Sequence, residues 1–294
     1  MRVLIAGGTG FIGRHLVSAL FSNGYDVGVL SRQARPSGDV IDNNITWIEL
    51  SNLCADLAYF KPDAIINCAV CYGNDISTLD VLHANAIFPL NLMRQAMDFG
   101  CRLFIQTDSF FGKPEYAYDH MLTYTRSKNE FIWWGKRLAA ETSTKLVNLR
   151  LEHVFGPGDG ATKFIPQILT KMVRGEDVEL TAGQQLRDFI YVEDVVTAYL
   201  KVLENQKHSG AVYCEYEVGV GSPTSLKEFV EECKKQLSSN SALKFGALSY
   251  RSTEIMSSVA KNKNLLDIGW KPVDDFRSGI SKLIKNLQVK KCHS

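Results

Sequence analysis

The feature that most constrains the fold is the glycine-rich segment GGTGFIG at residues 7–13. It follows a short apolar run and opens a stretch in which apolar residues recur at helical spacing. Gly7 allows a tight turn, Gly10 lets the backbone approach a pyrophosphate, and Gly13 permits close packing of helix on strand. Phosphates then lie at the positive N-terminus of the helix. The segment predicts a dinucleotide-binding βαβ unit whose cofactor-contacting residues are Gly7, Thr9, Gly10, Phe11, Ile12 and Gly13.

Strand-like and helical patterns alternate through the first half of the chain. Apolar strand-like runs lie at 63–70, 101–107 and 145–156, and helical patterns lie at 78–100 and 123–143. This alternation predicts an α/β fold with a doubly wound, parallel Rossmann sheet that has helices on both faces.

The pattern of predicted elements changes after residue 155, where the elements become shorter and the loops more polar. We expect a smaller, largely C-terminal substrate domain there. Residues 187–204 again have the pattern of an apolar strand and helix, so the two domains are expected to be interleaved. The predicted boundaries are 1–155 plus about 187–204 for the NADP-binding Rossmann domain, and 156–186 plus 205–294 for the substrate domain.

The end of the second strand bears on the choice of cofactor. NAD enzymes usually carry Asp or Glu there to bind the ribose 2′-hydroxyl. This chain has Ser31 and Arg32 instead. A guanidinium attracts a 2′-phosphate and can stack on adenine. We therefore predict NADP(H), with Ser31 and Arg32 among its contacts, although a solvated arginine at a strand end is common.

A Tyr-x-x-x-Lys pattern marks the candidate catalytic helix. Tyr124 and Lys128 lie one helical turn apart on the same face. A neighbouring ammonium favours the phenolate, so we expect Lys128 to lower the pKa of Tyr124. Tyr124 could then exchange a proton with a ketone or a sugar hydroxyl while hydride moves to or from nicotinamide. Thr107, at the end of the preceding strand, can hydrogen-bond the same oxygen.

Taken together, these motifs resemble the extended short-chain dehydrogenase/reductases, the nucleotide-sugar epimerase/dehydratase family. The resemblance covers nearly the whole chain. It rests on GGTGFIG, NCA (67–69), TDSFFG, YTRSK, LRLEHVFGPG, RDFIYVEDVV and DIGWKP. Within the family the chain is most similar to the 4-keto reductases that complete CDP-3,6-dideoxyhexoses, the CDP-abequose and CDP-paratose synthases. That similarity implies NADPH-dependent reduction of a 4-keto sugar and a role in lipopolysaccharide O-antigen biosynthesis.

The resemblance also implies roles for individual residues. Asn67 and Ala69 are expected in the cofactor cleft, and Asn85 at the cofactor side in support of the catalytic helix. Thr107, Tyr124 and Lys128 correspond to the catalytic triad, with Lys128 also binding the nicotinamide ribose. The residues expected at the substrate are Tyr72, Ser109, His153, Arg187 and Arg251, the two arginines at its diphosphate. For His153 a packed, hydrogen-bonded histidine is an equal alternative, and for the arginines plain surface charge is the alternative.

Asp108 and Ser109 help to distinguish a reductase from an eliminating enzyme. The nucleotide-sugar 4,6-dehydratases carry Thr-Asp-Glu here, with an acid for the departing hydroxyl and a base for the C5 proton. This chain has Thr107-Asp108-Ser109. A serine hydroxyl is too weakly basic to take a proton from carbon unaided. We therefore expect Asp108 to tune or position the catalytic site of a reductase.

Composition limits the remaining classes. The net charge is +1, which gives no electrostatic case for nucleic acid or an anionic membrane. No apolar run approaches membrane-spanning length, no signal peptide is evident, and the seven cysteines lack paired metal-ligand spacing. We expect a cytoplasmic enzyme without metal, and by resemblance a homodimer through helices at 78–99 and 123–143.

Two other functions stay open on the same sequence. A 4-epimerase or dehydratase would recycle tightly bound NAD and need no net reductant. A regulator that senses NADP without turnover belongs to another class, and the intact Thr107, Tyr124 and Lys128 speak against it.

Overall fold

A computed structural model describes residues 1–32, 44–73, 76–116, 118–142, 144–205 and 211–291. They fall into two compact units. Unit 1 comprises Met1–Arg150 and Tyr199–Tyr216, and unit 2 comprises Leu151–Ala198 and Glu217–Ser294. The second segment of unit 1, 199–216, overlaps the predicted return at about 187–204 over residues 199–204.

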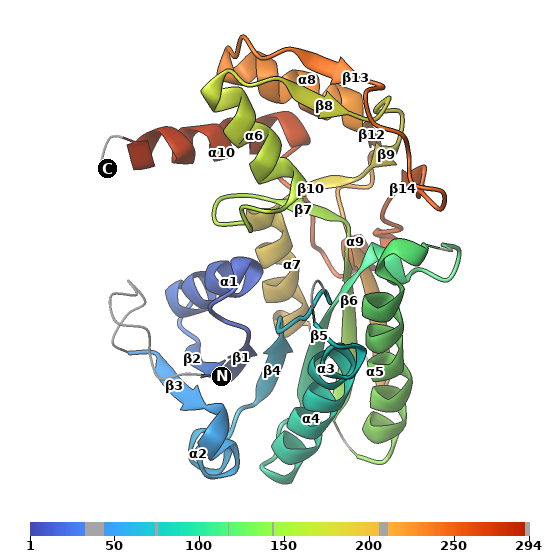
Figure 1. Cartoon of the computed structure of the whole chain (residues 1–294). Coiled ribbons are helices and arrows are strands. Elements are labelled where there is room, and N and C mark those ends of the chain that lie inside the picture. Colours follow the sequence, from blue (N-terminus) through green and yellow to red (C-terminus); the bar gives the residue numbers. More distant parts are fainter. Residues whose placement is uncertain (33–43, 74–75, 117, 143, 206–210, 292–294) are drawn as a thin grey trace. The chain divides into compact units, whose positions relative to one another are not determined.

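Seven strands build the sheet of unit 1 in the order β11-β6-β5-β4-β1-β2-β3 (Figure 1). Their bounds are β1 Arg2–Ala6, β2 Asp26–Ser31, β3 Thr46–Glu49, β4 Ala64–Asn67, β5 Leu103–Ser109, β6 Lys145–Leu151 and β11 Tyr213–Val218. Strand β1 pairs in parallel with β2 and β4, β2 with β3, and β4 with β5. The predicted doubly wound sheet is confirmed. Its order reverses between β1 and β4, the point at which such sheets bind ligands.

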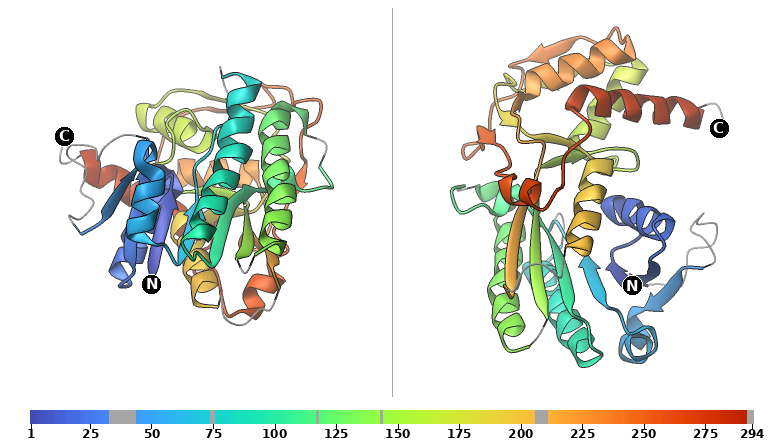
Figure 2. Two further views of the ribbon diagram at one scale, coloured as in Figure 1. Left: turned by 90° about the horizontal axis from the view of Figure 1, so that it is seen from below. Right: turned by 180° about the vertical axis from the view of Figure 1, so that it is seen from behind.

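Helices cover both faces of this sheet. They are α1 Phe11–Ser22, α2 Leu53–Phe60, α3 Thr78–Leu82, α4 Phe88–Asp98, α5 Leu122–Ala140 and the end of α7 Val192–Glu204, with 3₁₀ turns at Leu50–Asn52, Phe110–Gly112 and Asp119–Met121. One face packs against α2, α4 and α5 in a single core with Leu4, Ile65 and Phe104. Alternate strand residues point to the opposite face, where α1 packs on β1 and β2. Helices α4 and α5, teal and green, lie side by side in Figures 1 and 2.

The helix predicted over 78–100 is divided in the structure. Residues His83–Ile87 form a π-helical turn between α3 and α4. Pro89 lies in the first turn of α4, and a proline lacks the N–H that a regular helix would use there. Single π turns widen a helix locally and often accompany functional residues. Asn85 lies in this turn and is buried.

Unit 2 is built from short elements around its own core. They are β7 His153–Phe155, α6 Phe164–Arg174, β8 Val178–Leu180, β9 Leu186–Arg187, β10 Phe189–Tyr191, the start of α7, β12 Thr224–Ser225, α8 Leu226–Leu237, β13 Leu243–Phe245, β14 Ser257–Ser258, α9 Lys263–Asp267 and α10 Phe276–Lys291. The strands form the small sheets β10-β7, β12-β9-β14 and β13-β8. Phe155, Phe189 and Phe229 pack ring on ring at the centre of the core. None of the helices among the described residues combines the length and the apolar character needed to cross a bilayer.

Candidate active site

The glycine-rich turn between β1 and α1 has the shape that a bound pyrophosphate needs. Gly7 has φ of +79°, and a Cβ on it would lie 2.6 Å from the backbone nitrogen of Ala69. A Cβ on Gly13 would lie 2.1 Å from the carbonyl oxygen of Gly7, so both positions exclude a side chain. Helix α1 begins after Gly10 without a side-chain cap, which leaves N–H groups at its N-terminus for an anion. The residues present therefore fit a dinucleotide.

The segment that follows β4 is anchored beside this turn. Asn67 donates from Nδ2 to Gln106 Oε1 at 2.8 Å, and its Oδ1 accepts from the backbone N–H of Ala69 at 3.3 Å. Asn85 accepts from Cys71 N–H at 2.8 Å and donates to Cys71 O at 2.7 Å and to Ser127 Oγ at 3.1 Å. Because Ser127 is on α5, Asn85 connects this segment to the candidate catalytic helix, as the resemblance implies.

Thr107, Tyr124 and Lys128 occupy the carboxyl end of β5 and the first turns of α5. The ammonium of Lys128 donates to the carbonyl oxygen of Thr107 at 2.6 Å and lies 5.4 Å from the centre of the Tyr124 ring. The Tyr72 ring, which is 42% exposed, stacks on the Tyr124 ring with 5.3 Å between the ring centres. Burial lowers the pKa of Lys128, and the nearby Asp108 carboxylate opposes that shift.

The expected lowering of the Tyr124 pKa is not found in this structure. Burial raises the pKa of the Tyr124 phenol well above its usual value, and Tyr72 and Asp108 raise it further. A hydrogen bond from Ser109 acts in the opposite direction. Desolvation dominates because the phenolate would lose water that the surroundings do not replace. Tyr124 is therefore protonated at neutral pH, which suits a proton donor.

Asp108 belongs to a buried polar network instead of pointing freely into solvent. Its Oδ2 accepts from Asn148 Nδ2 at 3.1 Å and pairs with Arg150 Nη2 at 3.4 Å. Glu215 Oε2 lies 3.3 Å from the same Nη2 and accepts from Tyr213 at 2.6 Å. Burial alone would raise the pKa of Glu215, but the hydrogen bonds of Tyr213 and Asn148 together with Arg150 lower it.

Unit 2 brings three of the predicted substrate residues into one neighbourhood. Arg187 is buried and pairs with Glu254 at 2.6 Å. The N–H of Glu254 in turn donates to the carbonyl oxygen of Arg251, whose side chain is exposed. Burial and the charge of Arg187 lower the pKa of His153 to about 3, so this imidazole is neutral at physiological pH. Its ring makes an edge contact with Phe189 at 5.7 Å.

Asp188, between β9 and β10, holds this neighbourhood in place. Its carboxylate accepts the backbone N–H groups of Val220 and Gly221 at 2.8 Å each and of Ala260 at 3.1 Å. These three donors stabilise a fully buried carboxylate. The adjacent Arg187 is fixed as a consequence.

Comparison with known proteins identifies the family. The model of the NAD dependent epimerase/dehydratase family matches residues 3–219. The chain belongs to this family. A CDP-abequose synthase of Salmonella typhimurium is 40% identical over 97% of this chain and 98% of its own length. A dTDP-4-dehydro-6-deoxyglucose reductase of Escherichia coli is 23% identical over 98% of each chain.

Solved structures of the epimerase/dehydratase family share the fold. A UDP-glucose 4-epimerase of Thermotoga maritima, crystallised with UDP-glucose, superposes with a TM-score of 0.86 at 20% identity. The match covers 99% of this chain and 100% of the epimerase.

The predicted cofactor residues Ser31 and Arg32 lie at the carboxyl end of β2. Ser31 is the last residue of β2, and Arg32 follows it with an exposed side chain. Both belong to the carboxyl edge of the sheet that also carries the glycine-rich turn.

Sequence reasoning missed several polar side chains around the triad. Asn148 and Arg150 alternate with apolar residues along β6, and such polar positions in a buried strand were a usable signal. Tyr199 gave none, because an aromatic residue in an apolar helix normally belongs to the core. Its phenol oxygen nevertheless lies 2.6 Å from Thr107 Oγ1.

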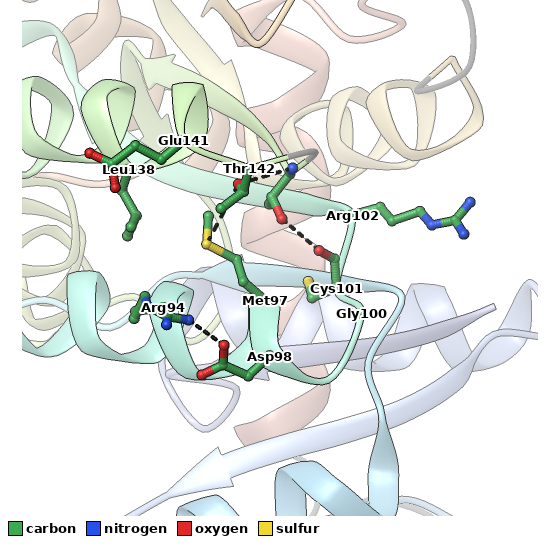
Figure 3. A pocket seen from close by; sticks show the side chains of 10 residues that line it. Arg94, Met97, Asp98, Gly100, Cys101, Arg102, Leu138, Glu141 and Thr142 are labelled. Atoms are coloured by element: carbon green, nitrogen blue, oxygen red, sulfur yellow. Dashed lines mark hydrogen bonds and ion pairs between the residues drawn. The ribbon is translucent and has the colours of Figure 1, made fainter.

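A hollow of about 520 Å³ in unit 1 lies away from these residues (Figure 3). It is lined at the amino ends of β5 and β6 by Arg94, Met97, Asp98, Arg102, Leu138 and Glu141. The triad occupies the other end of the same strands, so this hollow is not the active site.

Proposed function

We propose that this protein is an NADPH-dependent reductase of the 4-keto group of a nucleotide-linked, CDP-linked deoxy sugar. The observation that carries the proposal is the pairing of a protonated Tyr124 with Ser109, in a site whose only adjacent carboxylate, among the described residues, is tied to Arg150. Such a site supplies one proton to oxygen, and Ser109 is too weakly basic to take a proton from carbon.

The residues support a simple division of tasks. The cofactor, when bound, supplies hydride to the ketone carbon. Tyr124 donates its phenolic proton to the ketone oxygen, and solvent replaces that proton afterwards. The raised pKa of Tyr124 keeps this proton in place until the oxygen becomes strongly basic. Lys128 orders the end of β5 through its bond to the Thr107 carbonyl.

Asp108 argues against elimination. A dehydratase needs a protonated carboxyl group at this position to assist the departing hydroxyl. Here Oδ2 accepts from Asn148 Nδ2 at 3.1 Å and pairs with Arg150 Nη2 at 3.4 Å, so the Asp108 carboxyl is already engaged by other side chains. The missing second carboxylate at Ser109 leaves the C5 proton without an acceptor.

The choice of a CDP-linked sugar draws support from the relatives. CDP-abequose synthases of Salmonella typhimurium and Salmonella muenchen are 40% and 35% identical over 97% and 96% of this chain. Arg251 offers an exposed guanidinium for a diphosphate, whereas Arg187 beside it is buried and paired with Glu254. A role in O-antigen biosynthesis follows from the same proposal.

The test is product analysis by mass spectrometry. The protein is incubated with NADPH and either CDP- or dTDP-linked 4-keto-6-deoxy and 4-keto-3,6-dideoxy sugars. We expect a product two mass units heavier and stoichiometric loss of NADPH with a CDP-linked ketone. Formation of a 4-keto product from CDP-glucose or dTDP-glucose, or interconversion of epimers without loss of NADPH, would replace the reductase by a dehydratase or an epimerase. Binding of NADPH without any turnover would indicate a regulator.

The preference for NADP(H) is proposed from Arg32 and tested separately. Arg32→Asp replaces attraction to the 2′-phosphate by repulsion and supplies the acid that NAD enzymes use. The dissociation constants of NADPH and NADH are measured for both proteins. An unchanged ratio would make Arg32 a surface residue.

A homodimer through α4 and α5 is proposed on the family habit and on the exposed apolar residues of this region. Trp133 and Trp134 are each 52% exposed, and Leu79 is 76% exposed. Large apolar side chains in such positions are typical of interfaces. Light scattering of Trp133→Lys against wild type tests the proposal, because a dimer through this face should dissociate.

A further inference from the structure

Thr107 is contacted by two side chains that the proposed reaction does not use. Tyr199, on α7, is fully buried, and its phenol oxygen lies 2.6 Å from Thr107 Oγ1. The sulfur of Cys68, which follows β4, lies 3.2 Å from the same oxygen. All three residues belong to unit 1.

Both contacting groups hold their protons at neutral pH. Burial raises the pKa of Tyr199 well above its ordinary value. Burial also raises the pKa of Cys68 to about 11, although hydrogen bonding and Lys128 act against it. Each group therefore has an O–H or S–H to donate.

The direction of these bonds follows from the valence of the atoms. A hydroxyl oxygen has two lone pairs and one proton. The buried Tyr199 proton needs an acceptor, and a hydroxyl oxygen accepts far better than a thiol sulfur. Tyr199 therefore donates to Thr107, and Cys68 S–H is the remaining weak donor to the same oxygen. With both lone pairs occupied, the proton of Thr107 is directed to a third group.

We propose that Tyr199, assisted by Cys68, positions Thr107 as an obligatory hydrogen-bond donor to the substrate oxygen. A ketone oxygen only accepts, so it matches such a donor, whereas a hydroxyl that needs to donate to Thr107 finds no lone pair. The site would thus favour binding of the ketone over the alcohol product. This inference rests on the proposed function, because the match is to a ketone.

The experiment is a double-mutant cycle on the full-length protein. Tyr199→Phe removes one hydroxyl and keeps the ring. We expect kcat for ketone reduction to fall roughly three- to tenfold, the range of one neutral hydrogen bond, with the NADPH dissociation constant unchanged. In a Thr107→Ser background the same loss is expected, whereas in a Thr107→Ala background Tyr199→Phe should have no further effect.

A matched control separates this effect from a general loss of packing. Thr144→Val removes the buried hydrogen bond from Thr144 Oγ1 to Cys101 O, 2.7 Å long, in the same unit but at the other end of the strands. It should lower the melting temperature as Tyr199→Phe does and leave kcat unchanged. If Tyr199→Phe folds poorly, Cys68→Ala tests the same proposal. Its expected loss of kcat is smaller and should also disappear in the Thr107→Ala background.

Equal losses in both Thr107 backgrounds, or no loss at all, would overturn the proposal. A crystal structure of Tyr199→Phe adds a readout that needs no turnover. We expect the Thr107 hydroxyl to rotate or to gain a water at the position of the lost phenol oxygen. If the wild-type protein reduces no 4-keto sugar, the proposed function fails. The positioning of Thr107 by Tyr199 fails on a different result, namely a Thr107 hydroxyl that is unchanged in the crystal structure of Tyr199→Phe.

Discussion

The two ends of the unit 1 sheet differ in what they bury. At the carboxyl ends, β5 and its neighbours enclose Thr107, Tyr124, Lys128 and the Asp108–Arg150 pair. At the amino ends, the hollow of Figure 3 has a volume of about 520 Å³ and is bordered by exposed charges such as the Arg94–Asp98 ion pair. Buried polar groups in contact with one another mark the carboxyl end as the candidate active site, whereas the volume of a hollow does not identify one.

The difference has a geometric cause. Connections leave the carboxyl ends of β1 and β4 in opposite directions, which opens space exactly where the glycine-rich turn begins its helix. Burial in that space strengthens each electrostatic interaction and penalises each uncompensated charge. The amino ends are bordered by solvated charges such as Arg94 and Asp98.

The largest effect is expected from removing the proton donor at the carboxyl end of the sheet. Tyr124→Phe should lower kcat for reduction by about 10²–10⁴, because general acid catalysis is worth about that much. NADPH binding should be nearly unchanged, since the glycine-rich turn is intact. Steady-state kinetics and fluorescence titration measure the two quantities. Equal kcat in mutant and wild type would remove Tyr124 from the mechanism.

Breaking the buried ion pair should affect stability as well as rate. Arg150→Met leaves Asp108 and Glu215 without their guanidinium, and breaking such a pair costs about 3–5 kcal/mol of unfolding free energy. Arg150→Lys keeps the charge and should recover part of that loss. Urea unfolding followed by circular dichroism gives the values. A stability equal to wild type for Arg150→Met would mean that the network is solvated in solution.

The pH profile of reduction sharpens the comparison further. A free tyrosine loses its proton near pH ~10, and the acid form is the one that reduction needs. Because the pKa of Tyr124 is raised, kcat for reduction should stay level as the pH rises through that value, and should fall only above it. The profile is recorded with saturating NADPH and ketone. A decline centred well below pH ~10 would show that the cofactor or Lys128 lowers this pKa in the complex.

The smallest expected effect belongs to the amino end. Arg94→Gln removes a half-exposed pair with Asp98 one helical turn away, which is worth about 0.5 kcal/mol or less. Neither kcat nor the NADPH dissociation constant should change. A clear loss of activity would show that the hollow of Figure 3 contributes to function after all.

Local patterns were sufficient for much of this site. The glycine spacing predicted the turn, and the structure places Gly7 and Gly13 where no side chain fits. The four-residue spacing of Tyr124 and Lys128 predicted a shared helical face. The pKa of Tyr124 could not be predicted this way, because desolvation depends on the burial supplied by other segments, Tyr72 among them. Helical periodicity also could not predict the π turn that contains Asn85.

The sequence by itself determined the family and the α/β class and named the candidate triad, because each depends on short motifs in the chain. Tertiary structure decided how those residues are charged and held. Asp108 meets Arg150 and Glu215, and Thr107 meets Tyr199, 92 positions away, only when β5, β6, β11 and α7 pack together. Hydrogen-bond direction and pKa depend on such neighbours in space, and the spacing of residues along a chain does not specify them.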